Sequence, residues 1–487
     1  MTSIALRVAA SALLCAGGAG ALAATTEFCL DGDVDLGARY QGWQPAAGEF
    51  VPSRFCIVSD DETGRVRFHG QGRSNPDFYG EFTVLFLPSD RVRIVNRDSP
   101  PDLEFHPATV EHEAAAWRRL DPRRLLGMLD QHPEAQGPGP GDGWRIVRYP
   151  GAAYVVALQI VDGRLTHLRT HADLPLRGTV PVHWHWDWSE PDAPAARLVV
   201  DGEVVIRGRG RWRTLDESEA EAIWLPSDGI EPRQLPGAAW PAQTDMQLET
   251  LGAGVYVVRG VRTGFHHIVI DTAGGLVVGD APAGWVELLQ VPPADLVPGL
   301  GISGLSERFV DFLAREFPER PLRAVALTHH HDDHAGGARA FAAAGARVYA
   351  PAASAGFLED ALNRATMPED RLAALGERLT VTPVDGSLTL ADKQNTVRLL
   401  TLGPGPHASN ALGVHAVDAG WFFQSDLHVP HSDAPEPRAE RAQTECWFAA
   451  WAVANLLADT VVIGSHGSLQ TPVSRLAAYL ESPRCPS

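Results

Sequence analysis

Residues 323–337 of this 487-residue chain read RAVALTHHHDDHAGG, and this stretch decides the fold of the C-terminal half. The apolar run 324–327 predicts a short buried strand that leads into a turn, after which a helix begins. Gly336 and Gly337 allow that helix to pack closely behind the turn. The polar residues of the turn have the spacing His-x-His-x-Asp-His and are His329, His331, Asp333 and His334. Alternate histidines on an extended turn point the same way and can share one metal ion, whereas the Asp-His pair turns toward a second position alongside.

Three further residues of ligand type follow, each just after a predicted strand. The run VRLLTLGPGP leads to His407, WFFQS leads to Asp426, and VVIGS leads to His466. Loops at the same ends of neighbouring strands converge into one crevice, so these side chains can meet the histidines of the turn. A histidine-rich surface loop would collect metal only by accident, and the three separated residues argue against that interpretation.

Other polar residues near this set leave two interpretations open. His330 and Asp332 alternate with the turn residues and are expected to face away from the metal, toward solvent or behind the ligands. Further polar residues are expected either to face the cleft or to have a local role in a loop or turn, and these are His266, His267, Ser409, Asn410, His428, His431 and Asp433.

The turn, the three strand-end residues and the strands expected at 246–260 and 268–280 resemble the metallo-β-lactamase superfamily. The resemblance covers roughly residues 248–480 and implies a four-layer αββα sandwich, in which helices cover two packed sheets. It also implies that Asp280 orders the metal loop without binding metal itself. The ligands that it implies are His329, His331 and His407 for a first ion, Asp333, His334 and His466 for a second, and Asp426 as the bridge between both.

The expected mechanism follows from two ions at such a site. Two cations about 3.5–4 Å apart share a water, lower its pKa toward roughly 7 and hold hydroxide ready at neutral pH. The hydroxide attacks a carbonyl or phosphoryl centre, and a metal stabilises the oxyanion that develops. Asp333 is the expected catalytic residue, because it orients the hydroxide and carries its proton. The mixed nitrogen and oxygen ligands suit two Zn²⁺ ions best, with iron or manganese as alternatives.

The expected activity is hydrolysis of an ester, thioester, lactone or similar bond in a small molecule. Asp426 favours the glyoxalase-II-like and lactonase-like branches, because true zinc β-lactamases usually have Cys or Ser at the bridging position. A zinc β-lactamase is one alternative. Another is a non-catalytic periplasmic binding or assembly protein, in which metal only stabilises the fold. The net charge of −19 argues against a nucleic-acid partner, and the sequence does not indicate the oligomeric state.

The N-terminus predicts export. Residues 1–23, MTSIALRVAASALLCAGGAGALA, contain one basic residue, an apolar stretch and an A-x-A end that suits signal peptidase. A lipoprotein anchor at Cys15 is disfavoured, because Leu14 stands where a lipobox has a small residue. No later stretch is long and apolar enough to predict a transmembrane helix. The mature protein is therefore expected to be periplasmic or secreted.

Four cysteines follow this signal, and they are Cys29, Cys56, Cys446 and Cys485. Four cysteines allow three pairings, with buried free thiols as the alternative. Export favours disulfides. Local pairing of Cys29 with Cys56 and of Cys446 with Cys485 is predicted, since each bond would tie a terminal segment to its own domain.

Residues 24–240 predict a mainly antiparallel β domain with a covering helix and an unknown role. Its strands are expected in RVRFHG, FTVLFL, RVRIVN, YVVALQIV, LTHLRTH, PVHWHWDW, ARLVV, EVVIRGRGRW and AIWLP. Two Asp-Gly pairs, at 162–163 and 201–202, predict hairpin turns. The helix is expected at about 110–129, and the Gly- and Pro-rich residues 131–143 are expected to be a flexible connection.

A proline-rich linker is expected at 230–244, followed by the hydrolase domain at 246–487. Short apolar strands alternate there with helices expected at 306–317, 338–344 and 447–457, which is an α/β pattern.

The segment 183–188 reads HWHWDW and is the most conspicuous part of the N-terminal domain. Strand alternation places His183, His185 and Asp187 on one face and the three tryptophans on the other. The tryptophans are therefore predicted to lie in the core, beneath a polar outer face. A metal site made by the two histidines would need a third ligand, which the sequence does not show.

Overall fold

The computed structural model of the chain describes residues 25–35, 50–60, 65–75, 78–87, 92–95, 121–131, 136–139, 141–147, 155–174, 176–224, 246–261, 265–283, 304–364, 370–391, 394–429, 436–437, 441–466 and 470–485. The expected signal peptide at 1–23 and the expected linker at 230–244 lie outside these ranges. Within them, no helix has the length and apolar character needed to cross a membrane.

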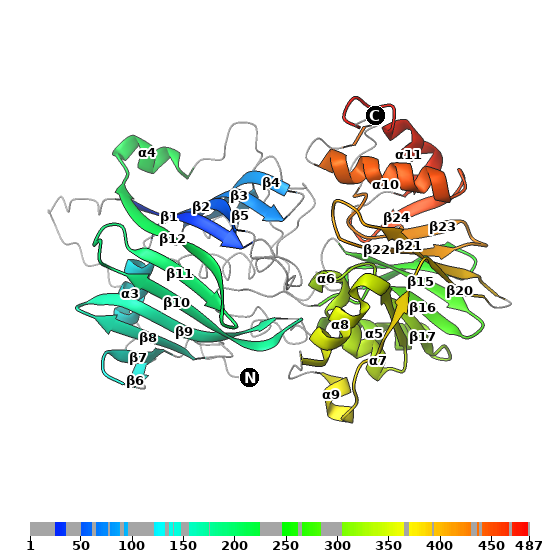
Figure 1. The fold of residues 1–487 in the computed structure, drawn as a ribbon, viewed down its shortest axis with the longest axis horizontal. Helices are drawn as coiled ribbons and strands as arrows, with labels where there is room; N and C mark the ends of the chain where they lie inside the picture. The colour runs from blue at the N-terminus through cyan, green and yellow to red at the C-terminus, as the bar shows by residue number, and fades with distance from the viewer. Residues whose placement is uncertain are drawn as a thin grey trace, which may run out of the picture.

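An antiparallel sheet forms the N-terminal part of the protein and has twelve strands among the described residues (Figure 1). Its strands are β1 Thr26–Asp35, β2 Phe50–Ser59, β3 Val66–Asn75, β4 Phe78–Leu87, β5 Val92–Val95, β6 Gln136–Pro138, β7 Trp144–Val147, β8 Val156–Val161, β9 Arg164–Leu174, β10 Gly178–Asp187, β11 Ala195–Val200 and β12 Glu203–Thr214. Their order across the sheet is β5-β4-β3-β2-β1-β12-β11-β10-β9-β8-β7-β6.

Both predicted Asp-Gly hairpin turns are confirmed. Asp162 and Gly163 join β8 to β9 with φ values of 50° and 72°, and Asp201 and Gly202 join β11 to β12 with 52° and 83°. A two-residue hairpin turn of this type needs positive φ at both positions, which Asp tolerates and Gly adopts freely.

The apolar face of this sheet carries the core, as the alternation in HWHWDW predicted. Trp184 and Trp186 are buried in this core, whereas His183 and His185 on the opposite face are only half-buried. Helix α3, Pro122–Gln131, packs against the apolar face through Leu125. This helix begins with proline, which is well suited to the first helical position. Of the predicted helix at 110–129, residues 110–120 lie outside the described ranges.

Two local predictions in the N-terminal part are wrong. Residues 131–143 are not irregular throughout, because Gln131 ends α3 and Gln136–Pro138 pairs with β7 as the edge strand β6. An edge strand tolerates proline, since one side of it needs no hydrogen-bond partner.

The second wrong prediction is the strand AIWLP. A capping box of Asp216 and Glu219 begins helix α4, Glu217–Ala222, and its acidic and alanine residues favour a helix. Ile223 and Trp224 come after this helix and pack on a small apolar cluster. The apolar residues Ile223 and Trp224 therefore reflect packing at a helix end and not a strand.

Two further sheets form the C-terminal part. One has the strands β13 Gln247–Gly252, β14 Val255–Arg259, β15 His266–Thr272, β16 Gly275–Gly279, β17 Leu322–Ala326, β18 Arg347–Pro351 and β19 Val381–Val384, in this order. The other has β20 Ser387–Leu390, β21 Val397–Gly403, β22 Ala411–Ala416, β23 Trp421–Gln424, β24 Val461–Gly464 and β25 Thr471–Pro472, in this order. The helices of this part are α5 Gly304–Glu316, α6 Asp332–Ala335, α7 Ala338–Ala343, α8 Ala352–Arg364, α9 Arg371–Leu375, α10 Ala442–Asn455 and α11 Val473–Tyr479.

The two sheets pack face to face, with helices on both outer sides (Figure 1). Side chains such as Val257, Ile270 and Val414 fill the core between the sheets. Helices α5, α7 and α8 pack on the first sheet, and α10 and α11 pack on the second. The predicted αββα sandwich behind an antiparallel β domain is therefore confirmed.

The predicted close packing behind the histidine turn is confirmed at Gly337. A Cβ atom there would lie 2.0 Å from Ser306 Oγ and 2.4 Å from the carbonyl oxygen of Pro282. The helices predicted at 306–317 and 338–344 correspond to α5 and α7. The helix predicted at 447–457 is α10, which begins earlier, at Ala442.

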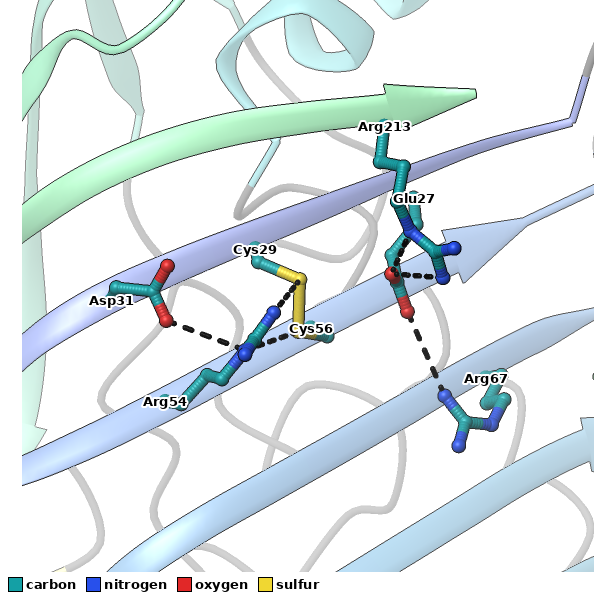
Figure 2. The surroundings of a disulfide bond; sticks show 7 residues. All are labelled: Glu27, Cys29, Asp31, Arg54, Cys56, Arg67 and Arg213. Atoms are coloured by element: carbon teal, nitrogen blue, oxygen red, sulfur yellow. Dashed lines mark hydrogen bonds and ion pairs between the residues drawn. A yellow bond between two sulfur atoms is a disulfide. The ribbon is translucent and has the colours of Figure 1, made fainter. Parts of the chain in front are cut away.

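Both predicted disulfides are confirmed. Cys29 and Cys56 are bonded across the directly opposed positions of β1 and β2, and Cys446 in α10 is bonded to Cys485 near the C-terminus. Arg54 lies over the first bond, 3.3 Å from Cys56 Sγ, and pairs with Asp31 (Figure 2). Glu27 lies close to the two cysteines, but these three residues are not a metal site, because both sulfur atoms are used in the disulfide.

One turn of the N-terminal sheet contacts the C-terminal part. Leu176, between β9 and β10, is 2% exposed and belongs to the apolar cluster that α5, α7 and α8 form with the first sheet. The β9–β10 hairpin reaches toward α8 in Figure 1. The two parts of the chain therefore share a small apolar contact.

Candidate metal centre

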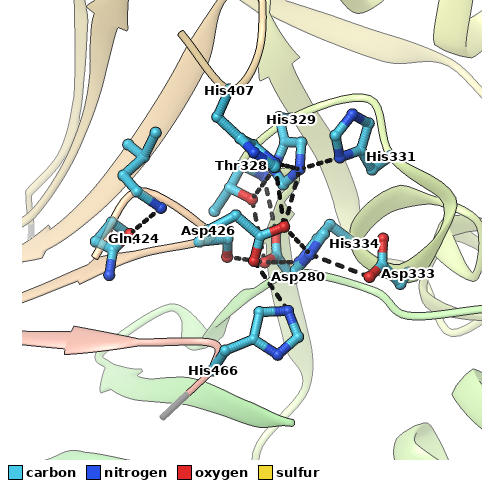
Figure 3. Close-up of polar contacts among 12 residues, drawn as sticks. Asp280, Thr328, His329, His331, Asp333, His334, His407, Gln424, Asp426 and His466 are labelled. Atoms are coloured by element: carbon cyan, nitrogen blue, oxygen red, sulfur yellow. Dashed lines mark hydrogen bonds and ion pairs between the residues drawn. The ribbon is translucent and has the colours of Figure 1, made fainter. Parts of the chain in front are cut away.

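Loops at the ends of four strands bring the seven predicted ligand residues together (Figure 3). The turn after β17 carries His329 and His331, and α6 continues it with Asp333 and His334. His407 follows β21, Asp426 follows β23, and His466 follows β24. The strand ends predicted from the sequence are therefore the ones that form this cluster.

The ligand atoms form two groups that share one carboxylate. His329, His331, His407 and Asp426 form the first group, and Asp333, His334, Asp426 and His466 form the second. Within each group all ligand atoms lie within 4.8 Å of one another. Six of the seven residues are buried, and His466 is half-buried.

Asp426 lies between the two groups. Its Oδ2 atom is 3.1 Å from His407 Nε2 and 3.3 Å from His334 Nε2, whereas its Oδ1 atom is 2.9 Å from His466 Nε2. The Oδ2 atom thus lies between a histidine of the first group and a histidine of the second, and Oδ1 faces the second group. This is the arrangement that a carboxylate shared by two cations requires.

Unsatisfied buried atoms indicate that the cluster fits cations. His334 Nε2 and Asp426 Oδ1 are buried and make no hydrogen bond with any described residue, although charged neighbours surround them. In the first group, His329 Nε2 lies 2.8 Å from His331 Nδ1 and 3.3 Å from His407 Nε2. Such closely spaced nitrogen lone pairs are stabilised when they coordinate a metal ion.

The protonation of the histidines also suits metal binding. Burial, assisted by the neighbouring imidazoles, lowers the pKa of His329 and His331 well below the usual value, so both rings are neutral at pH 7. Burial opposes the charge of His334 too, but the carboxylates of Asp333, Asp426 and Asp280 together raise its pKa well above the usual value. His329 and His331 are thus ready to coordinate, whereas His334 is protonated in the metal-free protein and must release a proton to bind an ion. Imidazoles beside several carboxylates form a donor set that attracts divalent cations.

Asp280 connects the three segments that carry these ligands. Its carboxylate accepts hydrogen bonds from Thr328 N at 2.7 Å, from Thr328 Oγ1 at 3.1 Å and from Ser425 Oγ. Its Oδ2 atom also lies 2.9 Å from His334 Nδ1. Because Nδ1 of His334 is engaged in this way, Nε2 faces the second group. This position agrees with the ordering role that was expected for Asp280.

The Gln424 side chain closes the loop around Asp426. Gln424 Oε1 accepts hydrogen bonds from Leu427 N at 3.0 Å and His428 N at 3.2 Å, and Nε2 donates to the His428 carbonyl at 2.7 Å. Asp426 itself has a φ of 64°, a left-handed conformation that is uncommon for residues other than glycine. The buried amide therefore holds a strained turn in place.

Sequence reasoning did not identify Gln424 and Ser425 as supporting residues. A signal was present, since two polar residues follow the apolar strand WFF directly before Asp426. Phe265 was also missed, and its ring lies 4.2 Å from the ring of His466 in an edge-to-face contact. An isolated phenylalanine has no pattern that would reveal such a position.

The other polar residues near the motif are not part of the two groups. His330 is buried rather than exposed, and its ring lies 6.3 Å from that of Phe357 in α8. His428 is also buried; its Nε2 atom lies 3.0 Å from Thr471 Oγ1, and its ring packs beside Phe448 and Tyr479. Both histidines therefore pack behind the cluster.

The other polar residues for which the sequence left two interpretations open also do not join the two groups, as far as the structure describes them. His267 is fully buried, with Nδ1 3.1 Å from the Gly279 carbonyl and its ring against Phe309. Ser409 is exposed and Asn410 is half-buried. Asp332 begins α6 without joining either group, and the half-buried His266 donates its backbone N–H to the carbonyl of Ser465. His431 and Asp433 lie outside the described residues.

The sandwich and its strand-end cluster define an αββα protein with a His/Asp centre that can bind metal ions. Residues 301–464 match the family model of the metallo-beta-lactamase superfamily, which agrees with the resemblance predicted from the sequence.

Solved structures of low sequence identity are similar to about half of the chain. One is a metallo-beta-lactamase from Pontibacter korlensis, with 16% identity and a TM-score of 0.34, covering 48% of this chain and 96% of that chain. Another is a metallo beta lactamase from Hirschia baltica, with 16% identity and a TM-score of 0.33, covering 50% of this chain and 99% of that chain. A comparison with curated proteins gives no match.

Proposed function

We propose that this protein is an exported hydrolase that binds two divalent metal ions and cleaves ester, thioester, lactone or similar bonds in small molecules. The observation that carries the proposal is the pair of His/Asp groups that share Asp426. Apart from Asp426, the two groups share no ligand. One ion therefore cannot be bound by both groups, and two adjacent ions are needed.

In this proposal His329, His331 and His407 hold the first ion, Asp333, His334 and His466 hold the second, and Asp426 contacts both. Divalent ions held by these residues would lower the pKa of bound water and so supply hydroxide near neutral pH. Zinc suits this mixture of imidazole and carboxylate ligands best, with iron or manganese as alternatives.

Asp333 is the proposed catalytic residue. Its carboxylate is 5% exposed, and its Oδ2 atom lies 3.5 Å from His334 Nε2 within the second group. A carboxylate in this position can orient the attacking water and accept its proton at a carboxylate oxygen. Asp280 and Gln424 act indirectly, since they position His334 and Asp426.

The proposed substrate class rests on the shared carboxylate. In the β-lactamase branches a Cys or Ser usually occupies this position, whereas thioesterase and lactonase branches retain Asp. Asp426 therefore favours an ester, thioester or lactone over a β-lactam.

Export is also part of the proposal. The two disulfides are compatible with an extracellular protein, because such bonds persist in oxidising compartments. The proposed organisation is a signal peptide at 1–23, an N-terminal β domain at 24–240 and a hydrolase domain at 246–487.

Elemental analysis of the mature protein and of Asp426→Ala tests the metal centre. We expect two ions per wild-type chain and at most one in Asp426→Ala, because both groups lose a shared ligand. Asp311→Ala is the matched control, since Asp311 on α5 pairs with Arg371 of α9 and belongs to neither group. Two ions in all three proteins, or none in the wild type, would contradict a shared binuclear centre.

A substrate screen separates the remaining alternatives. Thioesters, lactones, phosphodiesters and β-lactams should be tested on the metal-loaded wild type and on Asp333→Asn. Turnover of an ester-type substrate that is lost in Asp333→Asn supports the proposal, whereas preferential β-lactam turnover would identify a zinc β-lactamase. A fully loaded protein without turnover of any class would favour a binding or assembly protein.

A further inference from the structure

A cluster of basic and imidazole side chains lies on the outer face of the N-terminal sheet, opposite the buried tryptophans. His185 in β10 lies directly between His167 in β9 and Arg197 in β11, and His183 lies opposite Arg169. The ring centroids of His167 and His185 are 4.4 Å apart, and those of His183 and His185 are 6.1 Å apart. We call these five residues the imidazole–guanidinium patch.

The arginines of this patch lack the counter-charges that neighbouring arginines have. On β12, Arg209 lies 2.8 Å from Glu190 and Arg213 lies 3.1 Å from Glu27. Arg169 and Arg197 form no ion pair with a carboxylate in the described part of the chain, although the chain has a net charge of −19. A surface that keeps two uncompensated guanidiniums in an acidic protein is suited to an anionic ligand.

The patch is both accessible and partly ordered. Arg169 and Arg197 are exposed, and the three imidazoles are half-buried. The guanidinium carbon of Arg169 lies over the Trp144 ring, 4.6 Å from its centroid, and this cation–π contact orders the charged end of the side chain.

The electrostatic surroundings of the histidines are positive. Burial lowers the pKa of His167 and His183, and it lowers that of His185 to about 4; nearby arginines and imidazoles lower all three values further. No carboxylate contributes to these shifts. An anion placed on the patch would relieve this repulsion.

The patch does not have the geometry of a metal site. Among the described residues, His167, His183 and His185 do not form a group of three ligand atoms within 4.8 Å of one another. Two guanidiniums beside the imidazoles would also repel a cation.

We propose that the imidazole–guanidinium patch binds an oxyanion of the phosphate or sulfate type, either as a free ion or as the headgroup of an anionic lipid. Guanidiniums form paired, charge-assisted hydrogen bonds with such oxygens. Neighbouring strands are about 4.8 Å apart, and alternate residues of one strand are about 6.8 Å apart. The patch is therefore about as wide as a single oxyanion group, and it is too small to bind a long polyanion.

Binding is expected to strengthen as the pH falls, because a bound anion favours the protonated imidazoles. Among the side chains that the structure describes, the titratable and charged ones on this face of β9 to β12 include His167, Arg169, His171, His183, His185, Asp187, Arg197, Arg207, Arg209, Arg211 and Arg213. Sulfate is the suitable probe, since it keeps its charge over the pH range in which histidine titrates.

Calorimetric titration of the full-length mature protein with sodium sulfate at low ionic strength tests the proposal. We expect saturable binding that Arg169→Gln/Arg197→Gln weakens at least tenfold and that becomes stronger from pH 7.5 to 5.5. The control is Arg209→Gln/Arg213→Gln, which removes the same charge from the same face but leaves the patch intact. Any sulfate bound at the metal centre contributes equally to all three proteins.

Vesicle co-sedimentation distinguishes the two sources of the oxyanion. Binding to phosphatidylglycerol vesicles but not to phosphatidylcholine vesicles, lost in Arg169→Gln/Arg197→Gln, would identify a lipid headgroup. Sulfate binding without vesicle binding would identify a free oxyanion. The proposal is overturned if neither probe binds, or if the patch variant and the control variant lose binding equally.

Discussion

Asp280 organises the metal centre without being one of its proposed ligands. It is fully buried, and its carboxylate connects Thr328, His334 and Ser425. A carboxylate has enough acceptor positions for all these donors, whereas an amide has one oxygen and two hydrogens of its own.

Asp280→Asn should therefore weaken metal binding rather than remove a ligand. We expect at least tenfold faster loss of metal to a chelator, because the orientation of His334 is no longer fixed. The measurement is metal release to a chromogenic chelator, with circular dichroism to verify the fold. Ser425→Ala, which removes one donor and keeps the carboxylate, should have a smaller effect; equal effects would contradict this role of Asp280.

His267 is a buried histidine outside the metal groups, and its environment predicts a pH dependence of stability. Burial lowers its pKa from 6.5 to about 4. The unfolded chain therefore binds a proton that the folded chain excludes, so the contribution of His267 is complete above pH 6.5 and is lost as the pH falls toward 4. The pKa difference corresponds to about 3 kcal/mol.

His267→Asn should reduce this pH dependence. Its amide can still donate to the Gly279 carbonyl, but it does not titrate. Urea unfolding of metal-free wild type and variant at pH 7.5, 6 and 5 measures the difference. The free energy of unfolding should fall less steeply with pH in the variant, and parallel slopes would show that His267 is not the responsible group.

At the level of elements, the ends of four strands position the ligand residues of the candidate metal centre. Patterns of apolar residues predicted β17, β21, β23 and β24 and therefore the positions of the ligands that follow them. The errors occurred where an apolar pattern has two structural interpretations. Ile223 and Trp224 pack on an apolar cluster at the end of α4, and the letters of AIWLP alone do not separate a helix end from a strand.

The Gln424 loop gives a prediction at this level. Gln424→Ala leaves two buried backbone N–H groups and one carbonyl without their partner, each of which costs about 1–3 kcal/mol. We expect a lower melting temperature and weaker metal retention, because the turn that holds Asp426 is released. Differential scanning fluorimetry and metal analysis of the same sample measure both effects.

Gln394→Ala is the matched control for this experiment, since Gln394 is exposed and contacts Asp271 away from the centre. It should leave metal content unchanged. If Gln424→Ala retained full metal content and only lost stability, the loop would have no positioning role.

For the whole molecule, the disulfides tie both terminal segments to their own parts of the fold. They join residues separated by 27 and 39 positions. Closing loops of this size restricts the unfolded chain and stabilises the folded one by about 3–4 kcal/mol each.

Cys446→Ser/Cys485→Ser should therefore lower the melting temperature of the C-terminal part while leaving the metal groups intact. The bond joins α10 to the C-terminal residues, and neither cysteine belongs to a metal group of the C-terminal sandwich. Thermal unfolding with and without dithiothreitol is the measurement. The wild type should respond to the reductant at both bonds and the variant only at Cys29–Cys56, and an identical response would contradict the prediction.

The sequence by itself determined the strand ends and the seven candidate ligands, because spacing and strand periodicity are local properties of the chain, whereas the sandwich was implied by the resemblance to the metallo-β-lactamase superfamily. The local pairing expected for the four cysteines agrees with both disulfides. Only the tertiary structure decided that Gln424, Ser425 and Phe265 surround the centre and that His330 and His428 pack behind it. It also placed Arg169 and Arg197 on either side of the histidines of β10, with no ion pair to a carboxylate among the described residues. These relations join residues that are distant in sequence or on different strands. They depend on register, strand order and packing, which no single segment of the chain encodes.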